Sequence, residues 1–210
     1  TGHFVRYQND PSNPFSLSVP SIKVLYFDRA DILWIGTYLG GINKWDRTAS
    51  GIALFRKSPF NPNGLNSNQI RTVYVNKDDN IWIGTVDAGL NKWDTKTNTF
   101  THYTYNEDNP ASLSNNHVRS IIKTKNGKMW IGIDGGGVDI LIPGTTNFKH
   151  HRYDPENPYS LSNNRVWEIY QDSENQIWIG TFGGGLNKFN PDDDNFIHYQ
   201  NIPGDDNSLS

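Results

Sequence analysis

The stretch WIGTYLGGINKWD at residues 34–46 decides the fold, because the chain repeats it at a constant spacing. It returns as WIGTVDAGLNKWD at 82–94, WIGIDGGGVDILI at 130–142 and WIGTFGGGLNKFN at 178–190. The period is 48 residues, and no insertion or deletion separates the copies. Such a period indicates a chain that stacks one supersecondary unit several times.

Each repeat holds four short segments of strand-forming residues, separated by turns rich in Gly, Asn and Asp. In the fourth copy these segments are 166–171, 176–180, 185–189 and 196–199. Apolar residues nowhere follow a helical period for long enough to predict a helix. Four strands in a repeat of roughly 40 to 50 residues are typical of a β-propeller blade. We therefore predict an all-β fold made of four-stranded antiparallel blades.

A recurring leucine sets the boundaries of the repeats. It divides the chain into blade 1 (17–64), blade 2 (65–112), blade 3 (113–160) and blade 4 (161–208). Residues 1–16 match the last third of a repeat, so we expect them to be the tail of a preceding blade. Residues 209–210 would then begin a following blade, and the four blades would be part of a larger propeller.

The invariant positions have physical roles in such a fold. The Trp of each phrase is expected to fill the gap between neighbouring blades, in an equivalent buried place in every copy. The glycine two residues later allows another backbone to approach closely, and the glycines of the following turn permit a positive φ. These positions therefore serve the fold rather than chemistry.

Composition excludes several classes of protein. The 210 residues carry a formal net charge of -3, spread in small groups, which favours neither nucleic acid nor an anionic membrane as a partner. No run of about 18 apolar residues could cross a bilayer, so we expect no direct membrane contact by these residues. Cysteine is absent, which removes disulfides, thiolate zinc sites and cysteine nucleophiles from consideration.

The repeated phrase, with its Gly-Gly turn and its Leu/Ile-Asn-Lys-Trp-Asp ending, resembles the bacterial two-component regulator propeller repeat. Leu-Ser-Asn-Asn at 113–116 and 161–164 also fits that family. The third copy departs from it with Asp-Ile-Leu-Ile at 139–142, which puts its turn geometry in doubt. The Trp-Asp pairs at 45–46 and 93–94 are also similar to WD40 repeats, but the Gly-His element of those repeats is missing.

The resemblance implies a function. Members of the family usually form the extracytoplasmic, here periplasmic, half of membrane sensors, often hybrid histidine kinases, whose signal is commonly an oligosaccharide. We therefore expect a ligand-sensing module of a two-component sensor, which binds an oligosaccharide and contacts further blades or other copies of itself. A scaffold propeller for protein–protein contact and a glycan lyase or hydrolase are the alternatives.

Catalytic and cofactor motifs are lacking. The chain contains no Gly-x-Ser-x-Gly elbow, no His-Glu-x-x-His pair and no phosphate-binding loop, so we assign no catalytic residue, no cofactor and no enzymatic activity. His102, His150 and His198 are spaced like metal ligands, but the repeat places them on separate blades. Acidic clusters at 78–79, 192–194 and 205–206 are expected in turns without any ion. We therefore predict no metal site.

Candidate binding residues come from comparing the four copies with one another. Positions alike in every blade serve the fold, whereas positions that differ along one rim are available to a ligand. In a propeller, the loops that enter the first strand of each blade share a rim with the turns between the second and third strands. Arg and His there would contact acidic groups, and aromatic rings would stack on a sugar. The predicted ligand-binding residues are Tyr38, Asn116, His117, Arg119, Asp134, Asn164, Arg165, Trp167 and Phe182.

Overall fold

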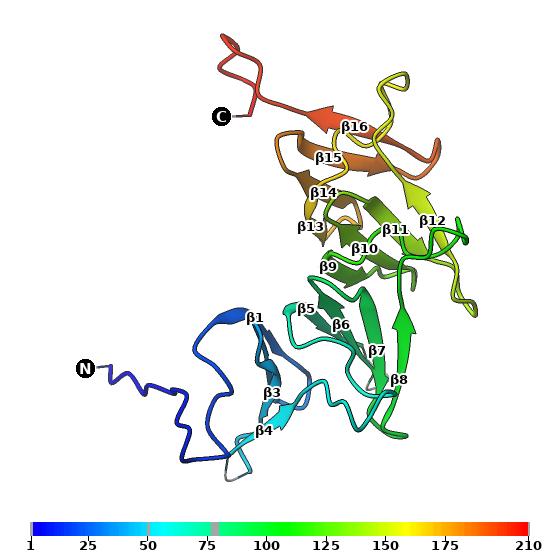
Figure 1. Ribbon diagram of the computed structural model, residues 1–210. Coiled ribbons are helices and arrows are strands. Elements are labelled where there is room, and N and C mark those ends of the chain that lie inside the picture. Colours follow the sequence, from blue (N-terminus) through cyan, green and yellow to red (C-terminus); the bar gives the residue numbers. More distant parts are fainter. Residues whose placement is uncertain (1, 50, 77–79, 210) are drawn as a thin grey trace. The chain divides into compact units, whose positions relative to one another are not determined.

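The computed structural model describes residues 2–49, 51–76 and 80–209, and within them every regular element is a β-strand (Figure 1). Four antiparallel sheets follow one another along the chain, each with its four strands in sequence order. Blade 1 comprises β1 (Ile22–Phe27), β2 (Leu33–Thr37), β3 (Gly41–Trp45) and β4 (Ile52–Phe55). Blade 2 comprises β5 (Ile70–Val75), β6 (Asn80–Thr85), β7 (Leu90–Asp94) and β8 (Thr99–Tyr103).

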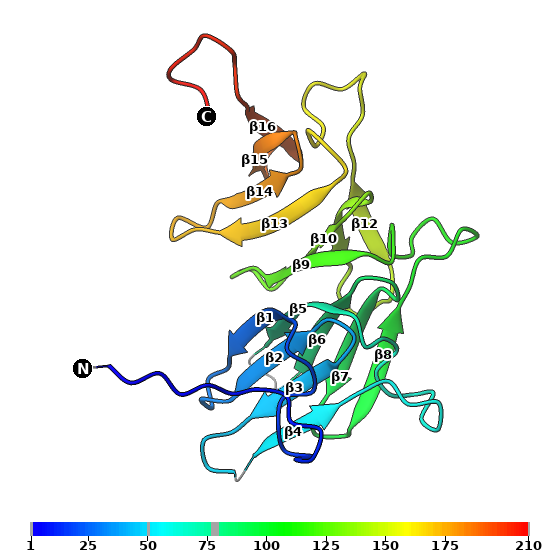
Figure 2. The same ribbon diagram turned by 60° about the vertical axis from the view of Figure 1, so that its left-hand side comes forward.

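Blades 3 and 4 repeat this arrangement. Blade 3 comprises β9 (Val118–Lys123), β10 (Met129–Ile133), β11 (Gly137–Leu141) and β12 (Phe148–His151). Blade 4 comprises β13 (Val166–Gln171), β14 (Ile177–Thr181), β15 (Gly185–Asn190) and β16 (Asn195–Tyr199). The predicted strands of blade 4 agree with these bounds to within one residue at either end. The all-β blade fold is confirmed, and Figure 2 shows the four successive sheets from a second side.

The chain divides into two compact units. Unit 1 spans Thr1–His102 and holds blade 1 with nearly all of blade 2, and unit 2 spans Tyr103–Ser210 and holds blades 3 and 4. In both units the first strand of the second blade packs against the first two strands of the blade before it. The core of unit 2 joins Trp130 and Val138 of blade 3 to Val166 and Ile169 of blade 4. Apolar burial between blades therefore holds each unit together.

The repeated Trp fills the gap between blades where a following blade covers it. Trp34 and Trp130 are 4% and 2% exposed, and each belongs to a core that includes residues of the next blade. Trp178 is only partly buried, so the prediction of four equivalent buried places is wrong for this residue. Its outer side lacks a cover because no fifth blade follows it in the described part of the chain.

The glycine of the Trp-Ile-Gly phrase lets the first strand of the next blade approach. A Cβ at Gly36 would lie 2.7 Å from Ile70 of blade 2, and one at Gly132 would lie 2.7 Å from Val166 of blade 4. A Cβ at Gly180 would meet nothing within 4 Å. At Gly36 an added Cβ would also lie 2.5 Å from Val24 of its own blade, whereas at Gly132 the nearest atom belongs to the next blade. The following blade therefore restricts the space at both glycines.

The departure of the third copy leaves the β10–β11 turn before it unchanged but alters the β11–β12 turn after it. Gly137 begins β11 with φ 83°, as Gly41 and Gly185 begin β3 and β15 with φ 77° and 75°. Asp139 replaces the Asn of the other copies but is equally buried, and its carboxylate accepts the Ser114 backbone N–H at 2.7 Å.

In the β11–β12 turn the positive φ lies at Gly144, whereas blades 2 and 4 have it at Asn98 and Asp194, which correspond to residue 146. Ile142 also lacks the side-chain oxygen with which Asp94 and Asn190 accept the N–H two residues later. The geometry of this turn therefore differs in the third copy.

Residues 2–16, interpreted as the tail of a preceding blade, form no strand in the structure. Phe4 and Tyr7, at the expected strand positions, are 103% and 55% exposed, because no strand lies beside them to pair with. The loop after them does follow the repeat. The Ile52 N–H donates to the Phe15 carbonyl at 3.0 Å, as the Phe196 N–H donates to the Tyr159 carbonyl at 2.9 Å.

Candidate functional site

The two variable loops of each blade meet at one edge of its sheet. The backbone N–H of the residue after the Trp-Ile-Gly-Thr phrase donates to the carbonyl that precedes the first strand, at 2.9 to 3.0 Å in all four blades. The donor and acceptor pairs are Tyr38 and Ser21, Val86 and Gln69, Asp134 and His117, and Phe182 and Arg165. A regular backbone frame therefore presents side chains that differ from blade to blade.

In unit 2 these loops bring six predicted side chains together in what we call the rim cluster: His117, Arg119, Asp134, Arg165, Trp167 and Phe182. Asp134 lies at its centre. One carboxylate oxygen accepts Arg119 Nη2 at 2.6 Å and Nε at 2.9 Å, and the other accepts Arg165 Nε at 2.9 Å. His117 Nδ1 lies 3.7 Å from the same carboxylate. Asp134 thus bridges blades 3 and 4 through charge-assisted hydrogen bonds.

These contacts fix the charge of Asp134. Burial raises the pKa of its carboxyl, but the hydrogen bonds from Arg165 and Arg119 outweigh burial and lower the pKa below the ordinary value. Asp134 is therefore ionised throughout the neutral range. The cluster carries two guanidinium charges and one carboxylate, which gives it a net positive charge.

Aromatic rings form the other half of the rim cluster. The Arg119 guanidinium lies 3.9 Å from the centre of the Trp167 ring, and that of Arg165 lies 4.4 Å from the Phe182 ring. The two rings stack with centroids 5.7 Å apart and planes 26° apart. Trp167 and Phe182 remain 45% and 53% exposed, which makes this an aromatic platform open to a ligand.

The two arginines differ in what they can offer. The Arg119 side chain is 11% exposed and turns two of its nitrogens to Asp134, so it holds the platform in place. The Arg165 side chain is 47% exposed and uses only Nε on Asp134. Its two terminal nitrogens have N–H groups left for a ligand.

Three predicted residues do not join the rim cluster. Asn116 and Asn164 accept the backbone N–H of Tyr105 and Tyr153 at 2.8 and 2.7 Å, and Asn68 does the same for Lys57. This repeated contact anchors the loop that leads into each blade, so both amides serve the fold. Tyr38 lies in unit 1, where the Lys23 ammonium is 5.4 Å from the centre of its ring.

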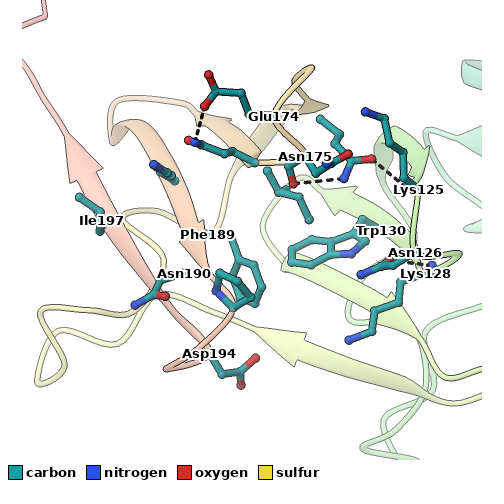
Figure 3. Close-up of a pocket in the computed structure, with 15 residues that line it drawn as sticks. Lys125, Asn126, Lys128, Trp130, Glu174, Asn175, Phe189, Asn190, Asp194 and Ile197 are labelled. Carbon is teal, nitrogen blue, oxygen red and sulfur yellow. Dashed lines mark hydrogen bonds between the residues drawn. The ribbon is translucent and has the colours of Figure 1, made fainter.

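A second hollow lies between blades 3 and 4, and sequence reasoning missed it. It is lined by the β9–β10, β13–β14 and β15–β16 turns, so it lies at the opposite edge of the sheets from the rim cluster. We call it the inter-blade groove (Figure 3), and its volume is about 900 Å³. Lys125, Lys128, Trp130, Glu174 and Phe189 are among its lining residues.

A signal for this groove was present in the sequence. Asp28 and Asp172 precede the Trp of blades 1 and 4 by six residues, and Thr124 stands at that position in blade 3. The comparison between copies was applied to one rim only, so the exchange went unnoticed.

The described residues contain no group of three or more His, Cys, Asp or Glu side chains arranged to hold a metal ion. The acidic pair at 78–79 lies outside the described residues. Asp194, from the cluster at 192–194, forms an ion pair with Lys149. No helix in the described ranges is long and apolar enough to cross a membrane.

Three segments of the chain, residues 64–87, 112–135 and 160–183, match the family described as two component regulator propeller. The chain carries two-component regulator propeller repeats. Each match runs from the recurring leucine of a blade through the first strand and the Trp-Ile-Gly phrase to the variable rim turn. No curated protein sequence matches the chain significantly.

Solved structures extend this result. The repeats resemble the extracellular domain of a hybrid two component system from B. thetaiotaomicron at 26% identity and a TM-score of 0.76, over 92% of this chain and 25% of that one. PorZ, a surface component of the type-IX secretion system of Porphyromonas gingivalis, is 18% identical with a TM-score of 0.69, over 95% and 30% of the two chains. Virginiamycin B lyase from Staphylococcus aureus is 14% identical with a TM-score of 0.62, over 88% and 56%.

The last two likenesses show the fold alone. The chain spans about a quarter of the length of the extracellular sensor domain from B. thetaiotaomicron.

Proposed function

We propose that the chain is a ligand-sensing module from the extracytoplasmic part of a two-component sensor, and that its rim cluster binds an oligosaccharide without turnover. The family match and the likeness to an extracellular sensor domain support the first part. The exposed Trp167–Phe182 platform, with the free N–H groups of Arg165 beside it, supports the second. A flat aromatic face with hydrogen-bond donors at its edge suits a sugar ring and its oxygens.

The propeller of the sensor would contain more blades than these four. The sensor domain of similar structure is about four times as long as this chain, since this chain covers only 25% of it. A repeat protein acquires one asymmetric site by varying the rim of a fixed scaffold, as blades 3 and 4 do here. Further blades would complete the ring and transmit binding to the output domain.

The experiment is calorimetric titration of the chain with a panel of neutral and acidic oligosaccharides. Replacing Arg165 by Ala removes a charge-assisted contact worth about 1.5–3 kcal/mol, so affinity for an acidic oligosaccharide should fall about ten- to hundredfold. Replacing Trp167 by Ala removes half of the platform and should weaken neutral and acidic ligands alike.

Arg47→Ala is the matched control, since the Arg47 guanidinium also lies over an aromatic ring, 5.9 Å from the centre of Trp45, but in unit 1. It should leave affinity unchanged. Equal losses in Arg47→Ala and Arg165→Ala would contradict the rim assignment. Release of a shortened glycan during the titration would contradict binding without turnover and favour a lyase or hydrolase.

A further inference from the structure

We infer that the inter-blade groove is a second binding site, which takes a small ligand through a carboxylate that accepts the Trp130 indole N–H. The groove lies at the opposite edge of blades 3 and 4 from the rim cluster, so this site is independent of the function proposed above.

Two other blades show what this indole N–H binds. Trp34 Nε1 donates to the Asp28 carboxylate at 2.8 Å, and Trp178 Nε1 donates to the Asp172 carboxylate at 2.8 Å. In both blades the carboxylate comes from the turn between the first and second strands. A carboxylate therefore binds the Trp nitrogen in two of the four blades, while blade 2 has Asn76 at the position of the Asp.

Blade 3 lacks that carboxylate. Thr124 occupies the position, and its hydroxyl donates to Asn126 Oδ1 at 2.6 Å. Trp130 is 2% exposed, yet its Nε1 is buried without a hydrogen-bond partner. A buried donor left unpaired is destabilising, and an acceptor from a ligand would offset that cost.

The space beside Trp130 is also larger than at the equivalent place in unit 1. The hollow beside Trp34, between blades 1 and 2, has a volume of about 280 Å³, against about 900 Å³ for the inter-blade groove. Trp93 packs edge-on against Trp34, whereas the smaller Phe189 takes that place against Trp130. Room for a ligand thus coincides with the missing acceptor.

The charges around the groove favour an anion. Lys125 and Lys128 flank the floor of the groove next to Trp130 (Figure 3). The Lys128 ammonium has no protein partner in the described part of the chain, and that of Lys125 reaches only the Ser173 carbonyl at 3.3 Å. Glu174 is engaged by Gln176 Nε2 at 2.9 Å, and Asp194 is paired with Lys149.

Three ammonium groups, those of Lys125, Lys128 and Lys188, therefore line the groove with two carboxylates, Glu174 and Asp194, and this balance favours a ligand with a negative charge. A carboxylate satisfies both the indole N–H and the ammonium of Lys128. Acidic sugars and acidic peptides both carry this group, and the space suits a ligand of two or three such units.

The test uses Thr124→Asp, which gives blade 3 the carboxylate of blades 1 and 4. The turns are alike, because Gly127, Asp31 and Asn175 hold the same position with φ 87°, 58° and 69°, so an Asp should fit. The chain has seven Trp, and their indole N–H signals can be followed by ¹H–¹⁵N correlation spectra. In Thr124→Asp the Trp130 signal should move to where those of Trp34 and Trp178 lie.

Digalacturonate, its neutral methyl ester and a blocked diglutamate peptide are the probes. Digalacturonate or the peptide should shift the Trp130 signal of the wild type, and whichever binds more tightly identifies the source of the carboxylate. The methyl ester should bind about tenfold or more weakly, as should either acid to Lys128→Ala. Thr124→Asp should abolish binding in the groove.

Arg165→Ala is the control, since it changes the rim cluster and should leave the Trp130 shift intact. The inference is overturned if Thr124→Asp binds the acids as well as the wild type does. It is equally overturned if the acids shift only Trp167, or if no probe moves the Trp130 signal at millimolar concentration.

Discussion

At the scale of single residues, blade 3 carries a buried ion pair that its neighbours lack. Asp139 and His150 face each other across β11 and β12, and His150 Nδ1 lies 2.6 Å from the Asp139 carboxylate. Asn187 and His198 hold the same register in blade 4, without the charge. The hydrogen bond that His150 donates to Asp139 raises the pKa of His150 above its ordinary value, against the opposing effect of burial.

The raised pKa predicts how stability depends on pH. The pair contributes fully below the unfolded histidine pKa of about 6.5, and this contribution is lost as pH rises through the higher folded pKa. Asp139→Asn keeps the acceptor for the Ser114 N–H but removes the charge, so it should destabilise unit 2 by about 1.5–3 kcal/mol at pH 5.5. Urea unfolding at pH 5.5 and 8.5 measures this, and a loss that grows with pH would contradict it.

At the scale of elements, the interface between blades 3 and 4 depends on a glycine, Gly132, in the second strand of blade 3. In unit 2 a Cβ added at Gly132 would lie 2.7 Å from the buried Val166 side chain of the next blade, so any side chain there must displace this neighbour. We expect Gly132→Ala to destabilise the protein by about 1–3 kcal/mol through overpacking. The measurement is the free energy of unfolding in urea.

Gly180→Ala is the matched control for this substitution, because it changes the same position of blade 4. Nothing lies within 4 Å of an added Cβ there, so its effect on stability should stay within about 0.5 kcal/mol. Equal losses in both variants would show that the glycine is needed by its own strand. In a longer chain with a blade after blade 4, Gly180→Ala should become as costly as Gly132→Ala.

At the scale of the whole molecule, the first strand exposes the surface that other blades bury. Ile22 and Leu25 of β1 are 43% and 59% exposed, whereas Val166 and Ile169, at the same positions of β13, are 0% and 2% exposed. Such an apolar strip favours contact with a further blade or with a second copy. We therefore expect the isolated chain to self-associate reversibly.

Leu25→Asp should weaken that association about tenfold or more, because burial of a leucine contributes about 1.5–3 kcal/mol. Sedimentation velocity over a dilution series measures it. Leu39→Asp is the control, since Leu39 is 57% exposed but lies in the β2–β3 turn. A chain that stays monomeric at all concentrations, or that responds equally to both variants, would contradict the expectation.

The sequence by itself determined the period, the sixteen strands and the edge at which the variable loops meet. Those features follow from local alternation and turn residues, which repeat with each copy and are visible along the chain. The same comparison selected nine residues from their variation, and the structure brings six of them together as the rim cluster. The other three include Asn116 and Asn164, although Asn68 at the same position of blade 2 already pointed to a role in the fold.

Only the tertiary structure decided what those side chains do to one another. Asp134 binds two nitrogens of Arg119 but only Nε of Arg165, so Arg165 keeps free N–H groups. This difference between the two arginines depends on distances across two blades. Trp34 and Trp130 are buried and Trp178 is not, because only the first two have a following blade that covers them. The Trp130 N–H is unpaired because blade 3 lacks the carboxylate that accepts this N–H in blades 1 and 4. Contacts between repeats are set by the pairing of different copies, which no single repeat encodes.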